Sequence, residues 1–190
     1  MQAIRLTEAA GALACGHVAC SVVGMSSAFW NAPAASNRPA AAACSSQASV
    51  HEAQILQVVS TMYRGGGLDP NVCTADVSFT DQAARCVGKA EVCEAFRALR
   101  VMKPEHVEEP LSVAKADGST EVYLHQRYSL MSMSAFTIRS VLVVHTAADG
   151  RLCSLEERWR GSPLLQFPAF RWVRRVNGLF SSLLTPLVIR

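Results

Sequence analysis

The chain has 190 residues, of which half are hydrophobic and 17% are charged. This composition excludes a disordered or collagen-like chain and fits a globular protein with a hydrophobic core. The net charge of +3 is unevenly distributed, because residues 1–50 carry +1, residues 51–157 carry −4 and residues 158–190 carry +6. The sequence therefore predicts an acidic domain between an N-terminal leader and a basic tail.

The leader at residues 1–50 contains 15 Ala, 7 Ser, two Arg and a single acidic residue, Glu8. N-termini rich in alanine and serine and poor in acids are typical of organelle transit peptides. Two alternatives stay open, a disordered N-terminus and a secretory signal with Gly11–Gly24 as its apolar core. The composition favours a plastid over a mitochondrion, so we expect an organellar protein that is soluble or peripherally bound to a membrane.

The seven cysteines do not form a recognisable pattern, since none of them belongs to a CxxC pair. A Cys15–His17–Cys20 cluster could supply half of a metal site, but the sequence offers no second half. We therefore expect free thiols, no metal and no cofactor.

The predicted domain at residues 51–161 begins with a helix near Val50, which Gly65–Gly67 ends. Alternating residues predict a short strand at 75–80, and residues 88–103 predict a second helix, which Pro104 ends. The segment Asp81–Val87 has no regular pattern. Apolar residues of the first helix recur on one face, three or four positions apart: Ala53, Leu56, Val59, Met62 and Tyr63.

Four longer strands are predicted next, at residues 106–116, 120–131, 135–147 and 151–160. Asp117–Gly118 and Asp149–Gly150 are hairpin turn signals between them. Helices followed by an antiparallel meander predict an α+β fold, in which the helices pack on one face of a curved antiparallel sheet.

The C-terminal extension at residues 162–190 contains an amphipathic helix. Arg171, Arg174 and Arg175 occupy its polar face. The helix could pack its apolar stripe on the domain with the arginines in water, lie in a membrane interface through residues 168–190, or bind a partner protein. The stripe consists of Trp172, Val173, Val176, Leu179, Phe180, Leu183, Leu184 and Leu187.

Three short motifs follow one another within residues 51–161. Phe79–Asp81 is an aromatic-x-Asp element at the end of the short strand, Gly88 opens a helix that holds Phe96, and Glu156–Trp159 places acidic residues before a Trp in the last strand. In this order they resemble the SnoaL-like families of the nuclear transport factor 2-like superfamily. The basic, Leu-rich tail resembles a plant and algal branch of unknown activity.

The resemblance implies a cone-shaped, cystatin-like roll whose helices and sheet enclose a pocket. Members of the superfamily include polyketide cyclases, ketosteroid isomerase, scytalone dehydratase and non-enzymatic binding or assembly domains, so the resemblance implies a fold more than a function. The side chains that we expect to line such a pocket are Tyr63, Phe79, Phe96, Tyr128 and Trp159.

A catalytic member of this fold needs a general acid or base in an apolar pocket, where burial raises the pKa of a carboxyl group. Asp81, at the end of the short strand, is one candidate, and its alternative role is to cap the turn that follows. His125 is the other candidate, because an imidazole carries protons near neutral pH.

The strand 120–131 has an apolar set of alternate residues and a polar set. We expect the apolar set to face the helices, which would leave His125, Arg127 and Arg139 on the open face of the sheet, where family members commonly dimerise. Glu156 and Glu157 point to opposite faces, so one of them must lie outside, and we expect the other to form a structural salt bridge with Arg127 or Arg139.

Two functions remain open. The first is a pocket domain that binds a small hydrophobic ligand or a partner protein. The second is a proton-transfer enzyme of the cyclase, isomerase or dehydratase type that uses Asp81 or His125. Nucleic acid is not an expected partner, because the domain is acidic and has no aromatic–basic repeat.

Overall fold

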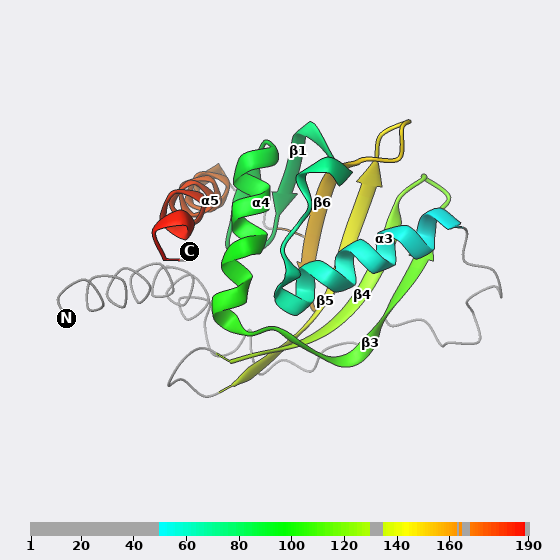
Figure 1. Cartoon of the computed structure of the whole chain (residues 1–190), viewed down its shortest axis with the longest axis horizontal. Coiled ribbons are helices and arrows are strands. Elements are labelled where there is room, and N and C mark those ends of the chain that lie inside the picture. The colour runs from blue at the N-terminus through cyan, green and yellow to red at the C-terminus, as the bar shows by residue number, and fades with distance from the viewer. Residues whose placement is uncertain (1–49, 130–134, 163, 165–167, 189–190) are drawn as a thin grey trace.

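The computed structural model describes residues 50–129, 135–162, 164 and 168–188. In this part of the chain six strands form one curved, unclosed sheet in the order β2-β1-β6-β5-β4-β3, with helices packed against it (Figure 1). The α+β class predicted from the sequence is confirmed. The strands are β1 (Cys73–Thr80), β2 (Arg85–Val87), β3 (Glu105–Ala114), β4 (Thr120–Tyr128), β5 (Phe136–Thr146) and β6 (Leu152–Trp159).

The sheet departs from the prediction at β1. Its neighbours β2 and β6 run in opposite directions, so that β1 is antiparallel to β2 and parallel to β6, whereas the other described pairs are antiparallel. Phe79 lies opposite Cys86 in β2 and opposite Leu155 in β6. Strand β2 falls in the segment predicted as irregular, because three residues are too few to show an alternating pattern.

Two helices lie on the same face of the sheet, α3 across the meander and α4 over the β1 end (Figure 1). Gly65 ends the first helix as predicted, since its φ of +78° is a left-handed conformation that glycine adopts at no steric cost. The second predicted helix, 88–103, is divided into an α-helix and a 3₁₀ turn. The helical elements are α3 (Val50–Thr61), η2 (Met62–Gly66), η3 (Pro70–Val72), α4 (Lys89–Ala98), η4 (Leu99–Met102) and α5 (Pro168–Val188).

The core lies between the sheet and these helices. In α3 and η2 the inward residues are Ile55, Val59, Met62 and Tyr63, while Ala53 of the predicted stripe is exposed. The predicted stripe therefore lies slightly off the buried face. The small alanine side chain buries little apolar area, so it is a weak guide to which face is inward.

The side-chain directions of β4 confirm the predicted face. Val122, Leu124 and Tyr128 are buried on the helix-covered side, whereas Arg127 is exposed on the other. Strand β5 follows the same alternation, with Ile138, Ser140, Leu142 and Val144 buried. Two hydrophobic clusters result, a main one around Tyr63 and Phe96 and a smaller one formed by Tyr128, Ile138 and Trp159.

Helix α5 packs against α4 and β2 at one end of the sheet (Figure 1). Among the described residues, no helix has both the length and the apolar character required to cross a bilayer. The predicted leader lies outside the described residues, apart from Val50.

Candidate functional site

A buried carboxyl group, that of Glu157 in β6, lies on the helix-covered side of the sheet. Its residue is 5% exposed. The phenol of Tyr63 donates a hydrogen bond of 2.7 Å to Oε2, and the hydroxyl of Ser140 donates one of 2.6 Å to Oε1. Both donors are neutral hydroxyl groups. A buried carboxylate is more usually paired with a guanidinium or ammonium group.

Burial and, to a smaller extent, the charge of nearby Asp81 together raise the pKa of Glu157 to about 7. Hydrogen bonds from Ser140, Tyr63 and Trp159 favour the ionised form and oppose this rise without cancelling it. At neutral pH the group therefore exists in both protonation states, which is the property that a general acid or base requires.

Asp81 follows β1 directly, and Thr80 pairs with Glu156 in β6, so the two acidic side chains come from adjacent strands. The Asp81 Oδ1 atom accepts hydrogen bonds from the backbone N–H groups of Ala83 at 2.7 Å and Ala84 at 2.5 Å. The turn-capping role considered from the sequence is thus present. Burial nevertheless raises the pKa of Asp81 to about 6, against the lowering effect of these bonds and of the Arg174 charge.

Tyr63 is fixed at both ends. Its phenol binds Glu157, and its backbone carbonyl accepts a 3.3 Å hydrogen bond from the side-chain amide of Gln126, which is completely buried. The same amide donates to the carbonyl of Glu105 at 3.0 Å, and its oxygen accepts from Nδ1 of His106. Burial raises the pKa of the Tyr63 phenol well above its usual value, so this group stays a proton-bearing donor.

The aromatic residues predicted for the pocket are connected to Glu157 directly or through one another. Tyr63 and Phe96 make an edge-to-face contact at 5.8 Å between ring centroids, and Phe79 makes another with Phe96 at 4.8 Å. Tyr128 stacks on Phe136 at 5.5 Å, and the charge of Glu157 contributes to the raised pKa of its phenol. Trp159 is buried beside Tyr128. Glu157 thus lies at the junction of the two hydrophobic clusters.

His125 lies elsewhere, on the open face of the sheet. Its Nδ1 atom is 2.8 Å from Oε1 of Glu108, and a guanidinium nitrogen of Arg139 is 3.1 Å from the same oxygen. The structure therefore separates the two candidate catalytic residues, with Asp81 beside the buried acid and His125 on the opposite side of the sheet. Dimerisation through this open face stays a prediction.

The prediction of a salt bridge between a glutamate of the last strand and Arg127 or Arg139 is wrong. Glu157 turns inward to Tyr63 and Ser140, Glu156 pairs with Arg158 at 2.7 Å, and Arg139 pairs with Glu108. Alternation turns one of the two glutamates away from solvent, but nothing in the sequence indicates that its partners are hydroxyl groups rather than an arginine, so Glu157 is not predicted as a site residue. Its shared parity with Trp159 was the signal that could have placed it inside.

The remaining chemistry is simple. In the described part of the chain, Cys73, Cys86, Cys93 and Cys153 are free thiols. Burial raises the pKa of Cys73 to about 11 and that of Cys86 to about 12, so neither is a ready nucleophile. No cluster of three or more His, Cys, Asp or Glu residues within the described ranges could hold a metal ion.

No family model matches the sequence, and no curated protein is similar to it. Solved structures of similar fold include a protein from Shewanella putrefaciens described as a SnoaL-like polyketide cyclase (9% identity, 60% of this chain and 82% of that one, TM-score 0.49). A steroid delta-isomerase from Pseudomonas aeruginosa is 14% identical over 70% of this chain and 90% of its own, with a TM-score of 0.43.

A third structure, a protein from Catenulispora acidiphila with a ketosteroid isomerase-like fold, was solved with trimethylamine. It is 13% identical, over 58% of this chain and 94% of its own, with a TM-score of 0.45. These are the families that the three sequence motifs resemble, and the likeness concerns the fold alone. The function must therefore be argued from the residues of the site.

Proposed function

We propose that this chain is a proton-transfer enzyme that acts on a small hydrophobic substrate, with Glu157 as the residue that takes up and returns the proton. The observation that carries the proposal is a buried carboxyl group held by two hydroxyl donors, in surroundings where burial raises its pKa to about 7. A carboxylate with an ordinary pKa of 4.5 is too weak a base at neutral pH to remove a proton from carbon efficiently.

The neighbouring groups support complementary roles. Asp81 is the second acid, and its negative charge keeps the proton affinity of Glu157 high. Tyr63 and Ser140 orient the carboxyl group. The aromatic side chains of Phe96, Tyr128 and Trp159 make the surroundings apolar, which suits a substrate with few polar atoms. His125 has no part in this proposal, because it lies on the other face of the sheet.

The test is hydrogen exchange at carbon. The purified chain is incubated in D₂O at neutral pH with 1-tetralone and with cyclic ketones of one and four rings, and loss of the α-proton signal is followed by NMR. The wild type is expected to accelerate exchange for at least one ketone, and Glu157→Gln to reduce the acceleration by about a hundredfold or more.

His125→Ala is the matched control, since it removes the other candidate base without touching the buried acids, and it should leave exchange unchanged. Equal rates for Glu157→Gln and the wild type would remove Glu157 from the reaction. Ketone binding without any exchange would instead support a ligand-binding domain that performs no chemistry.

We further propose that the protein works in an organelle, of which a plastid is the first candidate. The alanine- and serine-rich composition of residues 1–50 supports this. Sequencing the N-terminus of the protein isolated from its native cells tests it, because a transit peptide is removed near residues 44–50. An intact Met1 in the isolated protein would contradict the proposal.

A further inference from the structure

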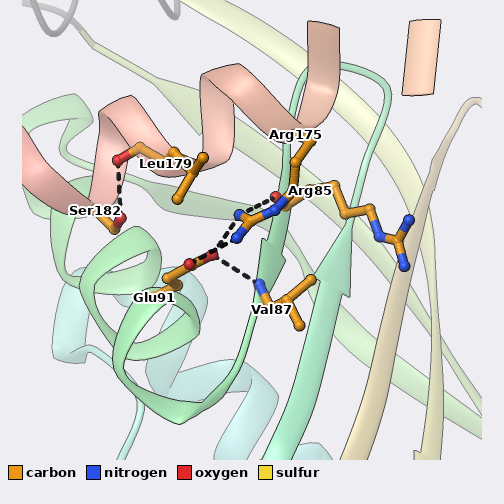
Figure 2. A network of polar contacts seen from close by, with 6 residues as sticks. All are labelled: Arg85, Val87, Glu91, Arg175, Leu179 and Ser182. Atoms are coloured by element: carbon orange, nitrogen blue, oxygen red, sulfur yellow. Dashed lines mark hydrogen bonds and ion pairs between the residues drawn. The ribbon is translucent and has the colours of Figure 1, made fainter. Parts of the chain in front are cut away.

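Helix α5 docks on the domain through the face that carries its arginines. The guanidinium of Arg175 forms two hydrogen bonds with the carboxylate of Glu91 in α4, at 2.6 and 2.9 Å, and a longer one of 3.4 Å with the carbonyl of Arg85 in β2 (Figure 2). The side-chain amide of Asn177 donates to the carbonyl of Ala83 at 3.0 Å. The sequence-based alternative in which the apolar stripe packs on the domain and the arginines face water is therefore wrong.

The close approach of α5 to β2 depends on Gly178. A Cβ atom at this position would lie 2.1 Å from the carbonyl oxygen of Arg85, which is far inside contact distance. Arg174 and Thr185 of the same face are also buried, at 4% and 3% exposure. Helical geometry thus forces the opposite face of α5 outward.

This outer stripe is formed by Trp172, Val173, Leu179, Phe180 and Leu183, which are between 37% and 69% exposed. With 3.6 residues per turn, these positions fall within an arc of about 120° on the helix. The arc contains no charged residue. An amphipathic helix ordinarily buries such a stripe in the core of its own domain, so the exposure of this one marks it as a candidate interaction surface.

We propose that the outer stripe inserts into the interface of an anionic lipid bilayer, with α5 lying parallel to the membrane surface and the domain held on its inner side. Tryptophan, phenylalanine and leucine on one face of a surface helix match the headgroup–acyl boundary. Helix α5 has no acidic residue that would repel an anionic surface, and Arg171 at its start is exposed, whereas Arg174 and Arg175 belong to the docked face.

The area of the stripe favours a bilayer over a second copy of the chain. At their observed exposures the five side chains present roughly 500 Å². A standard protein interface buries about 800 Å² on each partner. A bilayer has no such minimum, because each apolar group that enters the interface contributes separately.

The test uses the full chain and vesicles of phosphatidylcholine and phosphatidylglycerol in a two-to-one ratio, with binding measured by flotation. The wild type is expected to float with the vesicles, and the double variant Trp172→Glu/Leu183→Glu, at the two most exposed positions of the stripe, to lose about tenfold or more in partitioning. Both positions are exposed, so the fold is retained, which a urea unfolding curve verifies. Arg171→Gln should weaken binding less and reduce its dependence on salt.

Val107→Glu is the matched control, because Val107 is 48% exposed on β3, away from α5. It should bind vesicles as the wild type does. Equal flotation of the wild type and the double variant would overturn the proposal, and so would failure of the wild type to float. A wild type that dimerises in analytical ultracentrifugation, does not bind lipid, and becomes monomeric in the double variant would assign the stripe to a second copy instead. Ketone exchange is measured separately, so failure here leaves the proposed enzymatic function intact.

Discussion

The two faces of the sheet hold carboxylates in opposite ways. On the open face, Glu108 contacts His125 and Arg139, a histidine and a cation. On the covered face, Glu157 receives hydrogen bonds from Tyr63 and Ser140, which stay neutral. A cation stabilises a carboxylate as an anion, whereas hydroxyl groups in an apolar setting leave its charge costly. Burial on the covered face raises the pKa of Glu157 to about 7, although the hydrogen bonds from Ser140 and Tyr63 oppose the rise.

The largest expected effect is on the pH dependence of stability. Because the pKa of Glu157 rises from 4.5 in the unfolded chain to about 7 in the folded one, the folded state binds this proton more tightly. The stabilisation that this bound proton gives the folded state is present at low pH. It is lost as the pH rises through 7, which lowers the free energy of unfolding by about 3 kcal/mol. Glu157→Gln should remove this loss. Urea unfolding of both proteins at pH 5 and pH 8 checks it, and parallel pH profiles for the two would contradict the raised pKa.

The next effect comes from the hydroxyl donor on β5. Ser140→Ala removes a hydrogen bond to a buried carboxylate, so it should lower the free energy of unfolding at pH 8 by about 2 kcal/mol and raise the pKa of Glu157 further. Thr137→Ala is the matched control on the exposed face of the same strand and should change stability by less than about 0.5 kcal/mol. Equal losses in the two variants would show that the covered face gives Ser140 no special role.

Glu91 is an intermediate case, since its side chain is 21% exposed and is held by a cation. The hydrogen bonds from Arg175 lower its pKa. Glu91→Gln should destabilise the chain by about 1 kcal/mol at pH 7, mainly by loosening α5. Because the Arg174 charge on α5 lowers the pKa of Asp81, the same variant should raise that pKa. Carboxyl-carbon NMR titration of Asp81 measures the rise, and an unchanged Asp81 would mean that α5 stays in place without the pair.

The smallest effect is expected on the open face. Glu108→Gln removes an ion pair whose carboxylate is 38% exposed, so stability should change by about 0.5 kcal/mol or less, and added salt should reduce the difference. Proton exchange at carbon should not change. A loss of exchange activity in this variant would move the functional site to the open face and reverse the comparison.

Sequence patterns predicted much of the architecture, because alternation and turn chemistry are local. The hairpin signals at Asp117–Gly118 and Asp149–Gly150 lie between paired strands, and the apolar set of β4 faces the helices. The parallel pairing of β1 with β6 could not be predicted in this way. It joins segments far apart in the chain, and nothing in either strand alone specifies its neighbour.

The candidate site was predicted in part. Asp81 lies near Glu157 and Tyr63 binds it, but the sequence does not show which of Glu156 and Glu157 turns inward or that hydroxyl groups receive it. The orientation of α5 escaped prediction for a related reason. Periodicity assigns an apolar stripe to the interior. In the structure the helix docks instead through Gly178, which permits a close approach of the backbone, and through the bidentate ion pair of Arg175 with Glu91. Such complementarity depends on the partner surface, which a single helix sequence does not contain.

The parallel contact between β1 and β6 also sets when the domain can fold during synthesis. Phe79 pairs with Leu155, so the first strand to leave the ribosome has no neighbour on that side until nearly the whole domain has been made. The chain between β1 and β6 must lose conformational entropy before the pairing of these strands can stabilise the fold, which predicts slow folding. The surface of β2 and α4 that receives α5 is built on β1, so the C-terminal helix docks last.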